Sequence, residues 1–251
     1  LNSGLVTGSG LLTAGTYNLV TGEVAGALGA GVANVSGAVS LTGTTVATLL
    51  NINTGGVLTL GASERIGGAT AVDLNAGELA LGGFANTVGT LTLRNGGLLS
   101  GTGTLTAASY ALQGGTLNGS LGSGTATVTA GLTTLNGLLG AAVVNIDSGI
   151  LALGGADRLS GGAVVTLGGG TLDSGANATT VSVLQLNSGL VTGSGLLTAG
   201  TYNLVTGEVA GALGAGVANV SGAVSLTGTT VATTLNINTG GVLTLGASER
   251  I

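Results

Sequence analysis

The chain of 251 residues contains no cysteine, histidine, lysine, methionine, tryptophan or proline, and it has only three tyrosines and one phenylalanine. Without cysteine or histidine, a metal site built from thiolate or imidazole ligands is excluded within this sequence. The absence of cysteine fits a fold that does not depend on disulfide bonds, although it identifies no compartment. Few side chains remain that could carry reactive chemistry.

Charged residues are also scarce: the chain has four arginines and nine acidic residues, which give a net charge of −5. With no basic run to neutralise phosphates, nucleic acid is not an expected partner. Glycine, threonine, serine and asparagine interrupt every apolar stretch, even between Asn95 and Ile146, where no charge occurs. We therefore expect no membrane helix, no signal peptide and no membrane insertion of this segment.

What the chain has instead is repetition. Residues 1–66 and 186–251 match at 65 of 66 positions, and Leu49 against Thr234 is the single difference. This gives a tandem repeat, with residues 1–185 as one copy and 186–251 as a partial second copy. Each copy holds two units of about 93 residues, because similar segments end at Tyr17, Tyr110 and Tyr202. Near-identical copies of this kind indicate a window onto a longer array.

A finer period of about 18 residues lies within these units. It is marked by a glycine between two aliphatic residues, as in LNSGLV, LQGGTL and IDSGIL. The glycines assigned to this position are Gly4, Gly22, Gly37, Gly55, Gly77, Gly97, Gly115, Gly131, Gly149, Gly170, Gly189, Gly207, Gly222 and Gly240. The second residue after the glycine is Leu or Val in 13 of the 14 cases, and Thr133 is the exception. Each period thus predicts two short strands joined at a tight corner, where glycine supplies a backbone geometry closed to other residues.

A period of about 18 residues is too short for a helical hairpin and suits one coil of a β-solenoid. We therefore predict an all-β parallel β-helix over residues 1–251, as a single continuous solenoid with about 18 residues per coil and about 14 coils. Coils stacked at ~4.8 Å would make a rod about 65 Å long, and each 185-residue repeat would advance it by about 48 Å.

The residues two positions after the corners are expected to form a continuous internal ladder. The first-ranked core residues are Val6, Val24, Val39, Val57, Leu79, Leu99, Leu117, Leu151 and Leu172. Burying each of them contributes roughly 2 kcal/mol, which is offset by the ordering entropy of a chain rich in glycine. Stability should therefore come from stacking many coils.

An acidic residue followed by arginine recurs at Glu64–Arg65, Asp157–Arg158 and Glu249–Arg250. Successive copies would lie five coils apart, about 24 Å, so they cannot converge on one substrate. We interpret them as exposed loop pairs of little energetic weight, with a repeated ligand site as the alternative.

Glu23, Glu78 and Glu208 each follow a corner glycine, and strand alternation directs them outward. The same outward position is apolar in five other coils. These residues could form a lateral contact face, or they could lie under loops: Leu5, Leu98, Leu132, Ile150 and Leu190. The three tyrosines are expected to cover the core locally rather than to bind a ligand.

Enzymatic chemistry finds little support. The only nearby pair of carboxylates is Asp73 and Glu78, which has no equivalent in the other units, whereas a glycosidase needs two carboxyl groups roughly 5–10 Å apart. Aspartates are too sparse for calcium-binding coils, and the third residue after each corner is not regularly threonine, as an ice-binding face would require. We predict no catalytic, cofactor or metal-binding residues.

The segments Gly89 to Gly122 and Val143 to Gly175 resemble the passenger-associated β-strand repeats of autotransporters and filamentous-haemagglutinin-like exoproteins. The resemblance covers essentially the whole chain, although TYNLVTG and SYALQGG replace the usual Asn-Thr-Tyr-Thr-Gly-Gly run of those repeats. It implies a right-handed parallel β-helix, displayed on or secreted from a Gram-negative cell as a stalk or matrix fibre.

We therefore expect an extracellular structural repeat protein that forms a fibre, filament or surface stalk and is not an enzyme. The alternative is an adhesin module that recognises host or glycan surfaces. The expected partners are further copies of the same repeat, through end-to-end and lateral self-association, because solenoid ends expose unpaired strand edges.

Overall fold

The computed structural model describes residues 1–246, which contain strands and turns and no helix. The chain forms two compact units, Leu1–Gly124 (unit 1) and Thr125–Ile251 (unit 2). The prediction of an all-β chain is confirmed.

Unit 1 contains 15 strands, most of them two to five residues long. They are β1 (Leu5–Val6), β2 (Leu11–Leu12), β3 (Thr16–Leu19), β4 (Gly22–Val24), β5 (Ala27–Leu28), β6 (Val32–Val35), β7 (Ala38–Leu41), β8 (Thr44–Thr45), β9 (Leu49–Ile52), β10 (Val57–Leu60), β11 (Ala71–Asn75), β12 (Glu78–Ala80), β13 (Ala85–Ser100), β14 (Thr104–Leu117) and β15 (Ser120–Leu121). The long strands β13 and β14 continue around corners of the coil.

Unit 2 has 13 strands of the same kind. They are β16 (Thr125–Val128), β17 (Leu132–Leu135), β18 (Val143–Ile146), β19 (Ile150–Leu153), β20 (Val164–Asp173), β21 (Thr179–Thr192), β22 (Leu196–Leu204), β23 (Gly207–Val209), β24 (Ala212–Leu213), β25 (Val217–Val220), β26 (Ala223–Leu226), β27 (Thr234–Ile237) and β28 (Val242–Leu245).

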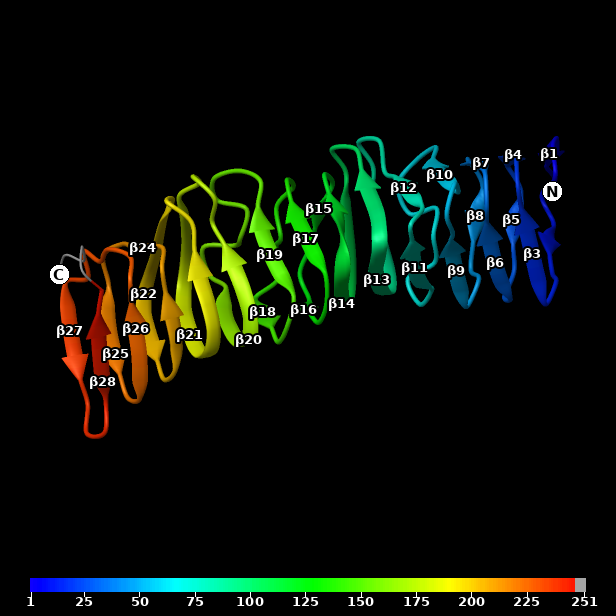
Figure 1. The fold of residues 1–251 in the computed structure, drawn as a ribbon. Coiled ribbons are helices and arrows are strands. Elements are labelled where there is room, and N and C mark those ends of the chain that lie inside the picture. The colour runs from blue at the N-terminus through cyan, green and yellow to red at the C-terminus, as the bar shows by residue number, and fades with distance from the viewer. Residues whose placement is uncertain (247–251) are drawn as a thin grey trace. The chain divides into compact units, whose positions relative to one another are not determined.

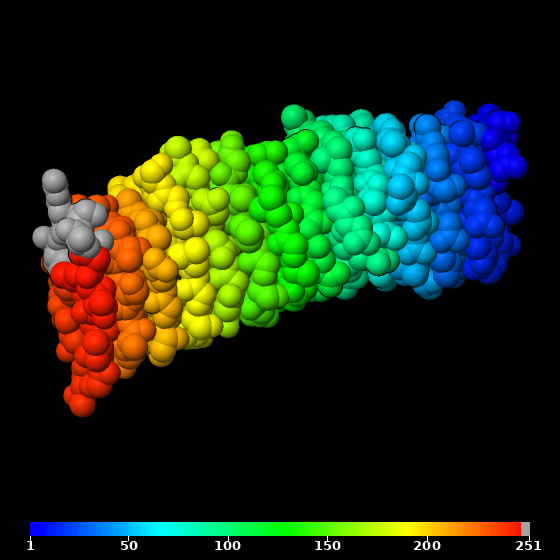
Figure 2. Space-filling view, in the orientation of Figure 1, coloured from blue at the N-terminus to red at the C-terminus, as the bar shows by residue number. Residues whose placement is uncertain are grey.

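Each unit is a parallel β-helix, in which every strand pairs in parallel with the equivalent strand of the next coil. The separation of paired residues along the chain varies, as the pairs Thr16 with Val32 and Leu49 with Ala71 show. The strands make about 13 turns, close to the predicted 14. Within each unit, Figure 1 shows the strands side by side, and Figure 2 shows consecutive segments as neighbouring bands. The β-solenoid prediction is therefore confirmed.

Three faces surround the core of each unit. In unit 1, the first face carries β1, β4, β7, β10 and β12, and the second carries β3, β6, β9 and β11. The third face carries β2, β5 and β8. In unit 2, the first face includes β17, β19, β23, β26 and β28, and the second includes β16, β18, β25 and β27.

Alternate residues of each strand point into the core and form aliphatic ladders. Seven of the nine first-ranked core residues are at most 2% exposed: Val24, Val39, Leu79, Leu99, Leu117, Leu151 and Leu172. Val6, in the first described coil, is only partly buried. The prediction for Val57 is wrong, because the next residue, Leu58, occupies the inner position and pairs with Leu79.

The predicted ladder is also not continuous. Gly22 pairs with Val39, and Val24 pairs with Leu41, so the residues two positions after these two corners are out of register. The cause is that Gly37 comes two residues before Val39, which is the residue of this coil that lies beside Gly22. From Leu58 through Leu79 and Leu99 to Leu117, the ladder is unbroken.

Corner glycines are required for two reasons. Gly22 has a φ of 118°, in the region that favours glycine. Gly37 has no such φ, but a Cβ atom there would lie 2.2 Å from the carbonyl oxygen of Val20 in the preceding coil. Nine of the 14 predicted corner glycines have a positive φ in this region, and the other five are Gly37, Gly77, Gly97, Gly170 and Gly222. Some corners therefore need glycine for its backbone conformation, and others need it because the neighbouring coil leaves no room for a Cβ atom.

Candidate functional site

The charged residues of unit 1 include one ion pair, between Asp73 on β11 and Arg94 on β13. The Arg94 Nη2 and Asp73 Oδ2 atoms are 2.6 Å apart, and Arg94 Nε donates to Asp73 Oδ1 at 2.9 Å. Hydrogen bonding to the carboxylate and its charge raise the pKa of Arg94 above its ordinary value. It is the only side-chain ion pair within residues 1–246. Asp73 is thus engaged by the next coil.

The glutamates that follow corner glycines bond to hydroxyl groups one coil later. Thr42 Oγ1 donates to Glu23 at 2.6 Å, and Thr227 Oγ1 donates to Glu208 at 2.7 Å. Glu78 accepts a hydrogen bond from Ser100. Glu78 and Asp73, the only near pair of carboxylates in the sequence, therefore have different hydrogen-bond partners.

The acid–arginine loops do not contain ion pairs in the described part of the chain. Glu64 is exposed, with a φ of 54°, and accepts hydrogen bonds from the Thr87 backbone and side chain at 3.2 and 3.3 Å. Asp157 repeats this conformation with a φ of 50°. The following Arg65 and Arg158 are partly buried, and the Nε atom of each is buried without a partner. Glu249–Arg250 lies outside the described residues.

The three tyrosines build one repeated local structure. Their exposed fractions are 6% for Tyr17, 1% for Tyr110 and 0% for Tyr202. Each hydroxyl accepts a hydrogen bond from the backbone N–H three residues earlier, at 2.9–3.0 Å. A carbonyl shortly before each tyrosine and another in the following coil lie within bonding distance of the same hydroxyl. The hydroxyl groups are therefore used within the fold, as expected for residues that cover the core.

A glycine in the coil after each tyrosine makes room for its ring. A Cβ atom added at Gly31, Gly124 or Gly216 would lie 3.1, 2.9 or 2.8 Å from the ring's Cε2 atom. It would also lie 2.0–2.3 Å from a backbone carbonyl oxygen of the preceding coil. Burial raises the pKa of Tyr110 and of Tyr202. Each buried tyrosine is thus paired with a glycine of the following coil, and this pair recurs with the repeat.

Sequence reasoning missed ladders of asparagine on the second face. Asn34 donates to Asn18 at 3.3 Å, and Asn51 donates to Asn34 at 2.9 Å. In unit 2, the second copy of the repeat forms the same arrangement, because Asn219 donates to Asn203 at 3.4 Å and Asn236 donates to Asn219 at 2.9 Å. The recurrence of asparagine at nearly one coil length could have revealed these ladders.

The predicted apolar row does not run unbroken along the first face. Leu132 and Ile150 are register neighbours and are 53% and 39% exposed. Thr171 follows Ile150 in the register, and Leu190 is followed by Glu208. In unit 1, Leu5 and Leu98 each pair with a glutamate, Glu23 and Glu78 respectively. In the register, the outward apolar residues are therefore interrupted by polar ones.

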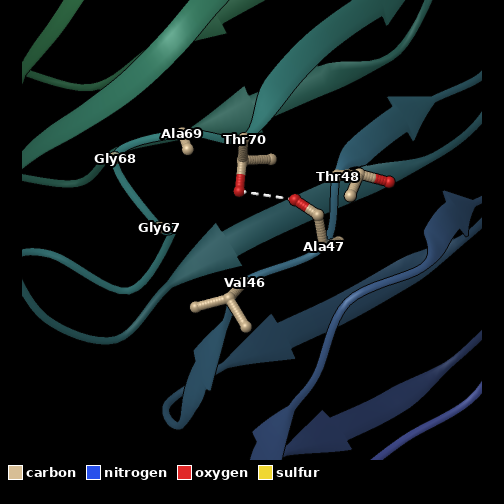
Figure 3. Close-up of a pocket in the computed structure, with 7 residues that line it drawn as sticks. All are labelled: Val46, Ala47, Thr48, Gly67, Gly68, Ala69 and Thr70. Atoms are coloured by element: carbon tan, nitrogen blue, oxygen red, sulfur yellow. Dashed lines mark hydrogen bonds between the residues drawn. The ribbon is translucent and has the colours of Figure 1, made fainter.

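A hollow in unit 1 has a volume of about 310 Å³ and is shown in Figure 3. It is lined by small side chains and backbone: Val46, Ala47, Thr48, Gly67, Gly68, Ala69 and Thr70. The Thr70 hydroxyl points to the Ala47 carbonyl and donates to it at 2.7 Å. No charged side chain lines this hollow, so it has little with which to orient a polar substrate.

Residues 1–246 contain no cluster of three or more acidic, histidine or cysteine residues that could hold a metal ion. The same residues include no helix long and apolar enough to cross a membrane. Comparison with protein-family models, curated proteins and solved structures found no match to this chain.

Proposed function

We propose that this protein is a non-enzymatic structural repeat protein, whose coils provide length in an extracellular fibre, filament or surface stalk. The observation that carries the proposal is the direction of its polar contacts. The asparagine ladders, the Asp73–Arg94 pair and the glutamate–hydroxyl bonds all join one coil to the next. These side chains stabilise a stack and do not converge on a cavity.

Repetition supports the same role. The bond between Glu23 and Thr42 recurs in the second copy of the repeat between Glu208 and Thr227, with nearly the same length. The hydroxyl contacts of Tyr17 recur at Tyr202. In a spacer, each coil serves as well as the next, so near-identical copies are compatible with function, whereas an enzyme gains little from copying inert coils.

A location outside a Gram-negative cell is part of this proposal. It is supported by the resemblance of Gly89 to Gly122 and Val143 to Gly175 to exoprotein repeats. Further copies of the repeat are the proposed partners, through end-to-end stacking and lateral contact. Immunogold labelling of intact source cells, before and after protease shaving, tests the location, and label confined to the cell interior would refute it.

Cryo-electron microscopy of the native material tests the structural role. We expect filaments whose power spectra contain an axial spacing of ~4.8 Å between coils and a longer spacing of about 48 Å from the 185-residue repeat. Particles with neither spacing would contradict the proposal. Saturable binding of the purified chain to a glycan array or a host-cell surface would favour an adhesin instead.

A further inference from the structure

The second face of unit 2 presents two unbroken rows of outward side chains. Its strand segments lie side by side in parallel register (Figure 1): residues 125–128, 143–146, 164–167, 183–186, 201–204 and 217–220. The first outward position of every segment is Val or Thr: Thr125, Val143, Val164, Val183, Thr201 and Val217. The second always carries a hydroxyl or an amide: Thr127, Asn145, Thr166, Gln185, Asn203 and Asn219. None of these side chains is buried.

These six segments contain no charged residue, although the chain is acidic. Asp173 pairs with Ala152 on β19, and Glu208 lies on β23, so both carboxylates are on the first face. Asp157 and Arg158 lie in the loop between β19 and β20, and Asp147 follows the end of β18. Two copies of a chain with a net charge of −5 repel each other, and this repulsion is least where neither copy presents a carboxylate.

A second copy of the chain also matches this face in spacing. The outward positions repeat every ~4.8 Å from coil to coil and every ~6.6 Å along a strand. Another solenoid of the same kind has both spacings, so each row can meet an equivalent row over many coils. The Val and Thr rows offer methyl groups to bury, and the amide and hydroxyl rows can form hydrogen bonds across the contact.

We propose that the second face is the lateral contact surface of the repeat, and that its partner is the second face of another copy of this chain. The two sheets would pack face to face about 10 Å apart, with their outward side chains interdigitated. This inference rests on the proposed structural role, because it specifies which face joins neighbouring fibres. It moves the lateral contact away from the first face, where glutamate and threonine interrupt the apolar residues.

The area of the face indicates a contact that is weak between single chains. Six coils at ~4.8 Å and four residues at ~3.3 Å give about 380 Å² per copy, which is about half of the ~800 Å² per partner in a typical stable interface. The face recurs with the repeat, because residues 16–19 and 32–35 have the sequences of residues 201–204 and 217–220. Arrays of many repeats should therefore associate much more tightly than this chain.

Sedimentation equilibrium of the full chain tests the contact. Reversible association should appear at concentrations up to about 1 mM. It should persist or strengthen when salt is added, because the contact contains no charge and salt screens the repulsion between acidic copies. A chain with Val164→Glu and Thr166→Glu should have a dissociation constant at least about tenfold higher. The matched control, Leu132→Glu with Thr134→Glu, changes the two outward positions of β17 on the first face and should leave association unchanged.

Cysteine cross-linking locates the contact independently, since the chain has no cysteine of its own. A short bismaleimide should join the Val164→Cys chain into dimers and leave the Leu132→Cys chain largely monomeric. Leu132 is 53% exposed and Val164 is 37% exposed, so exposure alone would give the opposite preference.

A chain that stays monomeric throughout, association that weakens when salt is added, or equal cross-linking at the two cysteines would overturn the proposal. Saturable glycan binding that the Val164→Glu and Thr166→Glu chain loses, without self-association, would also overturn it and assign the face to an adhesin. Native filaments that remain single would keep the structural role and lose this lateral contact, so the two proposals fail separately.

Discussion

Thr133→Val should stabilise unit 2. Thr133 is 0% exposed and stands two residues after a corner glycine, where the other 13 corners have Leu or Val. Its register neighbour on β19 is Leu151, and its Oγ1 atom has no hydrogen-bond partner. A buried hydroxyl without a partner costs about 1–3 kcal/mol, and valine replaces it with a methyl group of similar shape. We expect the free energy of unfolding to rise by about 1–2 kcal/mol.

Thermal unfolding and hydrogen exchange measure this gain. For a chain of this length, about 1–2 kcal/mol raises the midpoint by about 2–8 °C if the whole chain unfolds together. Solenoids can open over a few coils at a time, so exchange at the amides of β17 and β19 gives the sharper readout. Exchange there should slow by about 5–30-fold.

Thr134→Val is the matched control, because Thr134 is the adjacent residue of β17 and points outward, partly exposed. This variant should change stability by less than about 0.5 kcal/mol. If Thr133→Val left stability unchanged or lowered it, or if both variants had the same effect, the hydroxyl would not be an uncompensated polar group.

Tyr202→Phe removes a buried hydroxyl and leaves the Ala199 N–H and the Leu197 carbonyl without this hydrogen-bond partner. It should lower the free energy of unfolding, measured in urea, by about 1–3 kcal/mol. Burial raises the pKa of Tyr110 and of Tyr202, so the stability that their neutral hydroxyls contribute is complete below about pH 10 and is lost as pH rises through the folded pKa. Melting curves should show this loss at high pH, and it should be smaller in the Tyr110→Phe and Tyr202→Phe variants. Asp73→Asn should lower stability slightly at low salt and have no effect at high salt, because its ion pair is partly exposed. Asn219→Ala, which removes two ladder bonds, should cost about 1–2 kcal/mol, more than Asn236→Ala, which removes one.

The sequence was sufficient to predict the coil, because the short period and the alternation around each glycine are direct consequences of stacking. It predicted the inner positions of Leu99 and Leu117, where the corner glycines Gly97 and Gly115 are themselves paired in the register. It failed at Val57, because two adjacent glycines, Gly55 and Gly56, allow the corner to fall at either one. Only the pairing of Leu58 with Leu79 shows which glycine is used.

Contacts between coils were harder to predict than the coil itself. The asparagine ladders depend on which residues of neighbouring coils pair in the register. The register shifts where two corner glycines are closer together than one full coil, as Gly22 and Gly37 are. The register partner of Arg94 on β11 is Asn75 and not Asp73, so the ion pair is a diagonal contact that no fixed period predicts. Register was therefore the information missing from the sequence.

A chain with 53 glycines has much conformational entropy to lose, and each coil buries only a few aliphatic side chains. Neighbouring coils must then supply what a single coil lacks. Aliphatic ladders do this inside, and amide and hydroxyl contacts such as Asn219–Asn236 and Glu208–Thr227 do it outside. Because every such contact points along the stack, adding a coil stabilises the coil beneath it.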